Sequence, residues 1–403
     1  MVTAKQEGLT PTLRAIDTSV GVDQLLEIDK RATLMLGKVR DAMLAPHPAK
    51  DAPRFTTTTL SALCGIDRAR LNYLIGKGEL PPGEAKGVGK SRTFSLEEAR
   101  QWIRAEAGLP LRPHGQSGVS IVAANFKGGS TKTTTVMTLA QGLTLRGHRV
   151  LVIDLDPQAS LTSLCGLLPE KDVSESDTVM PLISGDATDL AYAIRSTYWD
   201  GMDIIPAMPA LFAAEFHIPS QVISRRNDPT WQFWNIIGNG MKSVREAYDV
   251  IIFDTAPALS YLTINALMAG DGMIMPLPPR SLDYASSTQF WSLFSDLVEN
   301  FRKQGFEKRF DFVSVLLSSV ATDTSAPVVR DWILDTYQRM VLPVEIPSTS
   351  VAGATSAQFG SVYDVTRWEG NAKTYQRARQ AYDGFVDLIN QKIAAKWAAT
   401  QEV

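Results

Sequence analysis

The stretch VSIVAANFKGGSTKTTTVMTLAQGL, residues 119 to 143, decides the fold of this 403-residue chain. An apolar run of strand type leads into a loop with two adjacent glycines, Gly128 and Gly129, and a helical pattern begins at about Thr131. Strand, glycine loop and helix start in this order predict a phosphate-binding loop, because backbone N–H groups and the helix dipole converge on an anion. The loop carries a second lysine, Lys127, in addition to Lys132.

The loop also predicts how a nucleotide is held. Lys132 is expected to bridge the terminal phosphates, and the Thr133 hydroxyl to ligate Mg²⁺. The residues predicted to contact the nucleotide are Lys127, Gly128, Gly129, Ser130, Thr131, Lys132, Thr133 and Thr134.

Two further strand ends supply carboxylates. VLVIDLDPQASLT (150–162) contains Asp154 and Asp156, which strand alternation places on one face, near a single Mg²⁺. YDVIIFDTAPALS (248–260) presents Asp254 at the exit of an apolar strand, where a carboxylate can hold Mg²⁺ through a water. The predicted metal set is therefore Thr133, Asp154 and Asp254.

From residue 119 onward, short Val/Ile/Leu-rich runs alternate with helical segments. These runs are VSIVAAN, RVLVIDLD, MDIIPAM, YDVIIFDTAP, DGMIMPLPP, DFVSVLLSSV and LPVEIP. The alternation predicts an α/β fold with a mostly parallel, doubly wound sheet, whose ligands lie at the carboxyl ends of the strands.

Residues 55–106 form a second predicted domain of the winged helix-turn-helix type. A helix, a turn at CGI, a helix from about Asp67, a Gly-rich hairpin and a helix capped by Ser95 follow one another. Between Arg54 and Arg104 nine Lys/Arg face five Asp/Glu, which favours DNA binding over a purely protein-binding helical domain. The predicted DNA contacts are Arg68, Arg70, Asn72, Tyr73, Lys77, Lys90 and Arg92.

The other segments complete the predicted organisation. Residues 1–20 read as a flexible tail and 107–118 as a linker before the domain 119–403. A helix within 21–46 has an apolar stripe that needs a partner, either the chain's own core or a second copy. Cys64 and Cys165 are expected to be buried thiols. We expect neither a signal peptide nor a membrane span.

KGGSTKT resembles the deviant Walker motif of the ParA and MinD class of ATPases. The resemblance implies a weak ATPase that uses ATP and Mg²⁺, with Lys127, Lys132 and Asp156 as catalytic residues. Lys127 would reach the phosphates bound by the other subunit of a nucleotide-sandwich dimer, and Asp156 would position the attacking water. MPLPPRSLDYAS (275–286) resembles the family segment that flanks adenine, which implicates Pro276, Pro278 and Pro279; strand-terminating prolines are the alternative.

Residues 55–390 resemble the large plasmid partition ATPases, especially those of repABC-type replicons. This implies a cytoplasmic, nucleoid-associated homodimer that binds non-specific DNA with ATP. A ParB-like centromere-binding protein would stimulate hydrolysis, and the helix-turn-helix would repress the protein's own operon. Thr131 departs from the family, where many relatives have glycine. Charge alone suggests Arg330, Arg339, Arg367, Lys373, Arg377 and Arg379 for the non-specific DNA surface.

Three other functions are weighed against this one. A MinD-like membrane ATPase would need a terminal amphipathic anchor, for which residues 385–400 offer an apolar side. A reductase of the nitrogenase iron-protein type needs two cluster cysteines in the ATPase domain, which has only Cys165. An enzyme that activates a small molecule with ATP would need a second substrate pocket, for which the sequence offers no candidate.

Overall fold

The structure is a computed structural model that describes residues 20–44, 50–86, 91–228, 230–321, 326–349, 360–365 and 370–401. The chain divides into two compact units, Met1–Lys50 and Asp51–Val403. Residues 1–19 of the predicted tail, as well as Lys90 and Arg367, lie outside the described residues.

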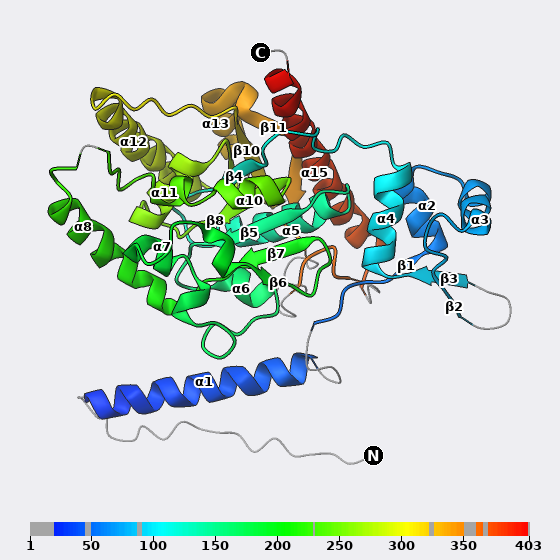
Figure 1. The fold of residues 1–403 in the computed structure, drawn as a ribbon, viewed down its shortest axis with the longest axis horizontal. Coiled ribbons are helices and arrows are strands. Elements are labelled where there is room, and N and C mark those ends of the chain that lie inside the picture. Colours follow the sequence, from blue (N-terminus) through cyan, green and yellow to red (C-terminus); the bar gives the residue numbers. More distant parts are fainter. Residues whose placement is uncertain are drawn as a thin grey trace. The chain divides into compact units, whose positions relative to one another are not determined.

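The first unit contains helix α1, Val22–Leu44, which confirms the helix predicted there (Figure 1). Its large apolar side chains are exposed, with Val22 at 71% and Leu34 at 61% of their full accessibility. Within the described part of this unit no other element covers the stripe.

The second unit begins with three helices and a hairpin at the positions predicted for a winged helix-turn-helix: α2 (Thr57–Cys64), α3 (Arg68–Lys77), β2 (Glu84–Lys86), β3 (Ser91–Phe94) and α4 (Leu96–Glu106). A short strand before them, β1 (Phe55–Thr56), was not predicted. The side chains of Thr56, Asp67 and Ser95 accept hydrogen bonds from backbone N–H groups of the first turns and so fix where the three helices begin. The strands form an antiparallel sheet in the order β1-β3-β2.

An eight-stranded sheet forms the rest of this unit, in the order β11-β10-β9-β4-β8-β5-β7-β6 (Figure 1). All seven predicted strands are present, and they pair in parallel: β4 (Val119–Ala123), β5 (Val150–Asp154), β7 (Met202–Ile205), β8 (Val250–Asp254), β9 (Gly272–Leu277), β10 (Phe312–Val320) and β11 (Val341–Pro347). The short strand β6, Arg195–Ser196, pairs antiparallel with β7 and was not predicted.

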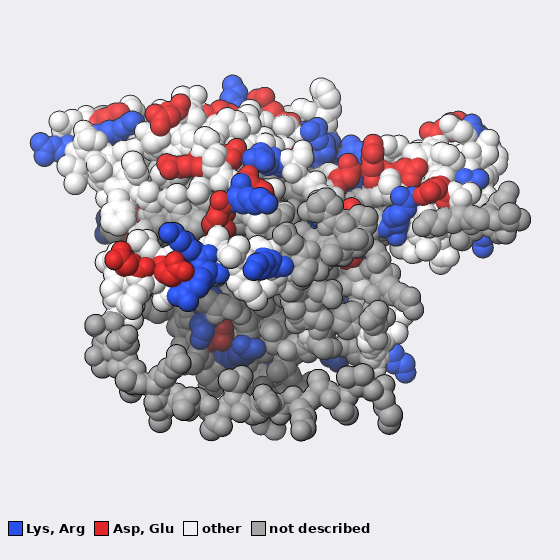
Figure 2. Space-filling model, turned by 90° about the horizontal axis from the view of Figure 1, so that it is seen from below, with Lys and Arg blue, Asp and Glu red and all other residues white. Residues whose placement is uncertain are grey.

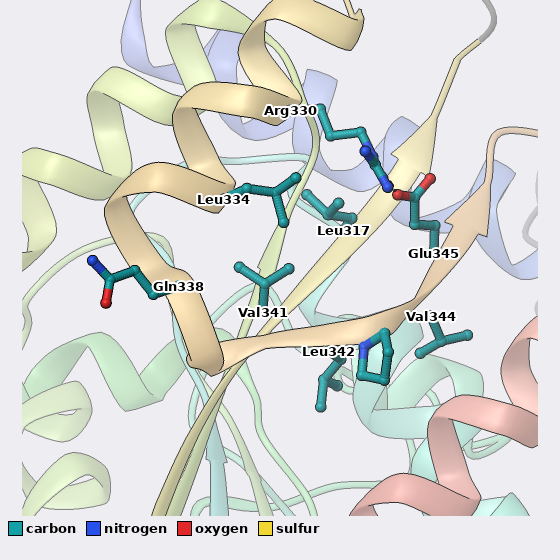
Figure 3. Close-up of a pocket in the computed structure, with 9 residues that line it drawn as sticks. Leu317, Arg330, Leu334, Gln338, Val341, Leu342, Val344 and Glu345 are labelled. Carbon is teal, nitrogen blue, oxygen red and sulfur yellow. Dashed lines mark hydrogen bonds and ion pairs between the residues drawn. The ribbon is translucent and has the colours of Figure 1, made fainter.

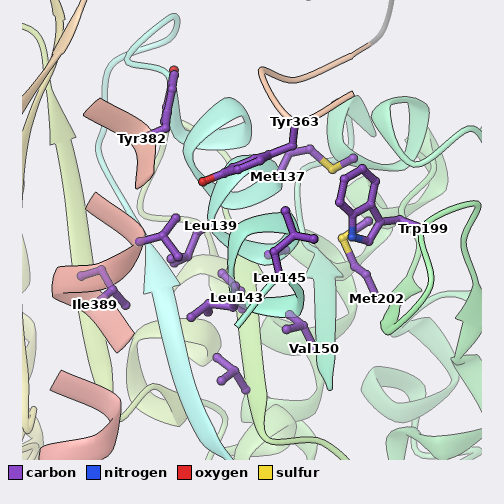
Figure 4. Close-up of a cluster of buried hydrophobic side chains, with 14 of the residues drawn as sticks. Met137, Leu139, Leu143, Leu145, Val150, Trp199, Met202, Tyr363, Tyr382 and Ile389 are labelled. Carbon is purple, nitrogen blue, oxygen red and sulfur yellow. The ribbon is translucent and has the colours of Figure 1, made fainter. Parts of the chain in front are cut away.

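Helices cover both faces of this sheet, as predicted. They are α5 (Lys132–Thr144), α6 (Ser160–Leu164), α7 (Met180–Ser184), α8 (Ala214–Ser224), α9 (Ile236–Asn239), α10 (Lys242–Ala247), α11 (Tyr261–Ala269), α12 (Ser281–Lys303), α13 (Ala326–Tyr337) and α15 (Ala372–Gln401). On one face α5 and α15 bury Met137, Leu139, Leu143 and Ile389 together with Trp199 and Tyr363 (Figure 4). The helices α7, α8 and α10–α13 contribute to the apolar cluster of the other face.

Residues 55–106, here called the winged unit after the fold predicted for them, share a core with the sheet domain through α4. Trp102 and Phe94 belong to the same buried cluster as Trp199 and Met202. Arg112, in the predicted linker 107–118, donates hydrogen bonds to the carbonyls of Arg245 and Tyr248 at 3.0 and 2.8 Å. The two predicted domains therefore pack together in one compact unit. The predicted boundaries between residues 55–106, 107–118 and 119–403 stay a prediction.

The C-terminal helix docks on its own domain. Phe385, Ile389, Ile393 and Trp397 are each at most 2% exposed, and the Trp397 indole N–H donates to the Ser117 carbonyl at 3.1 Å. The apolar side considered as a membrane anchor is thus occupied by the protein's core. Among the described residues, no helix is sufficiently long and apolar to cross a lipid bilayer.

Candidate nucleotide site and nucleic-acid interface

The glycine loop connects β4 to α5 at the carboxyl edge of the sheet. Gly129 and Thr131 both have left-handed backbones, with φ of +73° and +68°. A β-carbon added at Gly128 or Gly129 would meet no described atom within 4 Å, so the loop borders open space. Thr131 occupies a conformation that glycine adopts without strain.

Lys132 is the first residue of α5 and folds back over the loop. Its side chain is only 7% exposed, and its Nζ donates to the carbonyl of Lys127 at 3.2 Å. Burial lowers the pKa of Lys132, while the carboxylates of Asp254 and Asp156 oppose that shift. A buried ammonium beside two acids is poised to pair with an anionic ligand.

Asp254 ends β8 and is fully buried. Neither of its carboxylate oxygens makes a hydrogen bond of good geometry with a described residue, although the Thr133 hydroxyl lies near enough to interact with the carboxylate. Burial first, and then the charge of Asp154, raises the pKa of Asp254 to about 8, while Thr133 and Lys132 lower it. An unsatisfied buried carboxylate is costly unless a cation or proton compensates it.

These residues fit a nucleotide-bound Mg²⁺. Mg²⁺ commonly takes one or two protein ligands and completes its shell with phosphates and water. Asp254 and the Thr133 hydroxyl would hold it here, and it would neutralise phosphate charge. In the described part of the chain, no group of three or more His, Cys, Asp or Glu side chains forms a metal site by itself.

Asp154 lies opposite Asp254 in the register of β5 and β8, but its environment differs. Its oxygens accept hydrogen bonds from the backbone N of Asp156 at 3.2 Å and from the backbone N and hydroxyl of Thr162 at 2.9 and 2.7 Å. Burial raises its pKa to about 7, and the hydrogen bonds of Thr162 counteract that shift. Its predicted role near the metal stays a prediction.

The other two predicted catalytic residues lie on loops around this centre. Asp156 is partly buried, and its Oδ1 accepts from the backbone N of Gln158 at 3.0 Å. The backbone N of Lys127 donates to Asn125 Oδ1 at 3.1 Å, and Asn125 Nδ2 donates to the Pro276 carbonyl at 2.8 Å. Asn125 therefore ties the phosphate loop to β9.

The three prolines predicted to flank adenine are all buried near this edge. Pro276 lies within β9, paired with Leu316 of β10, whereas Pro278 and Pro279 follow the end of the strand. Pro276 is joined to the phosphate loop through Asn125, and the contact of all three prolines with a base stays a prediction.

Sequence reasoning missed three side chains that organise this centre. Asn125 and Thr162 make the bonds just described, and the Thr255 hydroxyl donates to the Ala123 carbonyl at 2.8 Å. Asn125 and Thr255 lie just beyond the ends of β4 and β8, whereas Thr162 lies within α6. The partners of all three are set by which strands become neighbours. For Asn125 and Thr255 the available signal was a polar residue after an apolar run, and Thr162 had no such signal.

The predicted DNA-contacting residues of α3 share one exposed surface. Arg68, Arg70, Asn72, Tyr73 and Lys77 are exposed, while Leu71 and Leu74 face the core. The cationic groups of Arg70 and Lys77 lie 5.9 and 5.6 Å from the Tyr73 ring centre. Arg92 on β3 donates to the Pro82 carbonyl at 2.7 Å. On the face shown in Figure 2, positive and negative side chains are interspersed.

The candidates chosen by charge for a non-specific DNA surface are partly used in ion pairs. Arg330 pairs with Glu345, and Arg379 pairs with Asp383 at 3.1 Å. Arg330 and Glu345 also border a cavity of about 500 Å³ between α13, β10 and β11 (Figure 3). That cavity is lined by Leu317, Leu334 and Val341 among others, and it contains no residue of the phosphate loop.

Comparison with known proteins defines the class. Residues 118–306 match the family model described as an AAA domain. The chain is 30% identical to "Putative replication protein A" of Rhizobium rhizogenes over 96% of this chain and 98% of that protein. It is 33% identical to Protein SopA of Escherichia coli K12, over 79% and 83%. A solved "Partition Protein" superposes with a TM-score of 0.65 at 20% identity, over 92% and 97% of the two chains.

The fold and the nucleotide loop therefore define a deviant Walker P-loop ATPase. Within that class, the chain belongs to the ParA-type plasmid partition ATPases and is similar to the replication protein A branch.

Proposed function

We propose that this protein is an ATP-dependent DNA partition switch that also represses its own operon. ATP with Mg²⁺ would bind the phosphate loop and drive dimerisation. The dimer would bind non-specific DNA, and a ParB-like centromere-binding protein would stimulate hydrolysis and so release it. The observation that supports this best is the phosphate loop itself, in which Lys127 and Lys132 flank open backbone opposite the unpaired carboxylate of Asp254.

The two lysines would have separate tasks. The Lys132 ammonium is buried and directed back over its own loop, as expected of a group that binds phosphate within one subunit. Lys127 is less buried, and its backbone holds it in the loop: its N–H donates to Asn125 Oδ1 and its carbonyl accepts from Lys132. A cation supplied in trans would be absent until two subunits meet, so dimerisation would control hydrolysis.

This division of tasks is tested by comparing two variants. Lys132→Ala should lose nucleotide binding, whereas Lys127→Ala should keep much of it and lose ATP-dependent dimerisation and hydrolysis. Equilibrium binding of a fluorescent ATP analogue, sedimentation and phosphate release provide the measurements. A Lys127→Ala variant that hydrolyses ATP normally as a monomer would contradict the trans mechanism.

The winged unit would recognise the operator through α3. Arg68 and Asn72 are exposed on a helix whose other face is buried, so their substitution can alter recognition without disturbing the core. Arg68→Ala and Asn72→Ala should abolish binding to the chain's own upstream DNA and leave ATPase activity intact. Lys303→Ala, which removes an exposed cation at the end of α12, is the matched control.

DNA binding without nucleotide and with ADP, ATP or a non-hydrolysable analogue tests the switch as a whole. Random DNA and upstream DNA are compared at stated ionic strength, because phosphate contacts depend on salt. ATP-dependent retention of random DNA supports the proposal. If no nucleotide changes either affinity, the switch is refuted.

A further inference from the structure

The loop that carries Asp156 is fastened at its base by Asp154. The fully buried Asp154 side chain accepts one hydrogen bond from the backbone N of Asp156 and two from Thr162. Those two residues stand at the two ends of the segment 156–162. A single carboxylate therefore closes the loop that contains the candidate for positioning the attacking water.

Thr162 extends this closure to a neighbouring strand. Its hydroxyl donates to Asp154 at 2.7 Å and accepts from the backbone N of Ala207 at 2.8 Å. Since a hydroxyl carries one proton, the two bonds form a directed chain from Ala207 through Thr162 to Asp154. Strands β5 and β7 are adjacent, with Ile153 paired to Ile205, so the chain ties together the loops that follow both strands.

The loop needs such anchors because its backbone is not relaxed. Ala159, just before α6, has a left-handed backbone with φ of +52°, which is unfavourable for a residue with a β-carbon. Conformations of this kind persist when the surrounding bonds impose them. The bonds that can impose it include those made by Asp154, Asp156 O accepting from Ala159 N at 2.8 Å, and Ala159 O accepting from the backbone N and hydroxyl of Ser163 at 3.0 and 3.1 Å.

We propose that Thr162 is a positioning residue for ATP hydrolysis, which holds the Asp156 loop in place by linking Asp154 to Ala207. Thr162 is completely buried and acts through Asp156 rather than by contact with the nucleotide. The inference rests on the proposed function, in which Asp156 orients the attacking water. A purely structural hydroxyl would affect folding stability alone, so the two roles differ in what they predict for turnover and for local exchange.

Thr162→Val tests the proposal because valine keeps the shape and removes the hydroxyl. The matched control is Thr178→Val: Thr178 is also completely buried, and its hydroxyl donates to Glu175 O at 2.7 Å and accepts from Met180 N at 3.2 Å. We expect Thr162→Val to lower kcat by about tenfold or more, the effect typical of a lost outer-shell partner, with the dissociation constant for ATP nearly unchanged. Thr178→Val should leave kcat as in the wild type.

A second readout needs no turnover. Hydrogen exchange of the nucleotide-free protein should be faster for amides 156–162 in Thr162→Val, and unchanged there in Thr178→Val. Thr162→Ser, which keeps the hydroxyl, should restore both kcat and slow exchange. Thr162→Ala replaces the valine variant if that variant does not fold.

Normal turnover with normal loop exchange in the hydroxyl-free variant would overturn the proposal, as would a kcat loss equal to that of Thr178→Val. If the wild type hydrolyses no ATP with DNA and its partner present, the proposed function fails instead. In that case the exchange comparison still decides whether Thr162 holds the loop.

Discussion

The two ends of helix α5 are chemically opposite. At the amino end, the hydroxyls of Ser130 and Thr131 and both oxygens of Asp254 are buried and have no partner among the described residues. At the carboxyl end, Arg100 of the winged unit donates to the carbonyls of Thr144 at 3.3 Å and His148 at 2.9 Å.

Further donors complete the carboxyl end. Arg104 donates to the Gly147 carbonyl, and the Trp199 indole donates to the Thr144 hydroxyl at 2.7 Å. Helix ends expose backbone groups that must be satisfied, and cations favour the carboxyl end. The amino end of α5 therefore has buried polar groups that a ligand could bind, whereas the backbone carbonyls at its carboxyl end accept hydrogen bonds from residues 55–106. At this helix, buried groups without a partner lie at the candidate nucleotide site, whereas backbone carbonyls with side-chain donors lie at the contact with residues 55–106.

Lys132→Ala should give the largest effect and appear only in ligand binding. Removing one partner of a desolvated charge pair costs about 2–5 kcal/mol, so nucleotide affinity should fall by at least one to two orders of magnitude. Folding stability without nucleotide should change little, because removing the buried ammonium also removes its desolvation cost, and Asp254, whose pKa is raised to about 8, can hold a proton in its place. Calorimetric titration with Mg-ATP and urea unfolding measure the two quantities. Near-normal ATP affinity would show that the amino end is not the binding end.

Arg100→Met should show the reverse pattern. Arg100 is only 8% exposed. Its guanidinium donates hydrogen bonds to two backbone carbonyls and to the Asp200 carboxylate, so its loss leaves buried acceptors unpaired. We expect the free energy of unfolding to fall by about 2–4 kcal/mol, with ATP affinity in the folded protein preserved. Arg54→Met, which breaks an exposed pair with Glu84, is the control and should cost about 0–1 kcal/mol.

These arginines also show where sequence reasoning stops. Arg100 and Arg104 were counted among the basic residues of the winged unit, and that count favoured DNA binding. The structure directs both toward the sheet domain instead. Nothing in α4 alone reveals which of its faces meets a second domain, because that depends on a contact between segments more than forty residues apart.

Local patterns predicted the elements themselves. The apolar runs predicted all seven parallel strands, the predicted cap at Ser95 marks the start of α4, and the helix predicted from about Asp67 is α3. Strand β6, only two residues long at the sheet edge, has no periodicity to detect. The part of the site in loop 127–134 was predictable because its residues follow one another in the sequence. Thr162 and Asn125 were missed because their partners depend on strand order.

Gly201→Ala tests the Arg100 contact at the carboxyl end of α5 by crowding the guanidinium instead of removing it. Gly201 has φ of +79°, and an added β-carbon would lie 2.0 Å from Cζ of Arg100. Strain and displacement of the guanidinium should together cost about 2–3 kcal/mol. The cost should shrink in an Arg100→Met background, because part of it is the clash with Arg100. Fully additive costs in urea unfolding of the double variant would refute the contact.

Thr131→Gly should have the smallest effect, and it should raise the free energy of unfolding rather than lower it. Thr131 precedes α5 with φ of +68°, makes no side-chain cap and buries its hydroxyl without a partner. Glycine relieves the left-handed strain, so we expect the free energy of unfolding to rise by about 1 kcal/mol. Ala140→Gly, inside the same helix, is the control and should cost about 1 kcal/mol. Loss of stability in both variants would mean that the amino end of α5 is not strained, and the contrast between the two ends would then rest on hydrogen bonding alone.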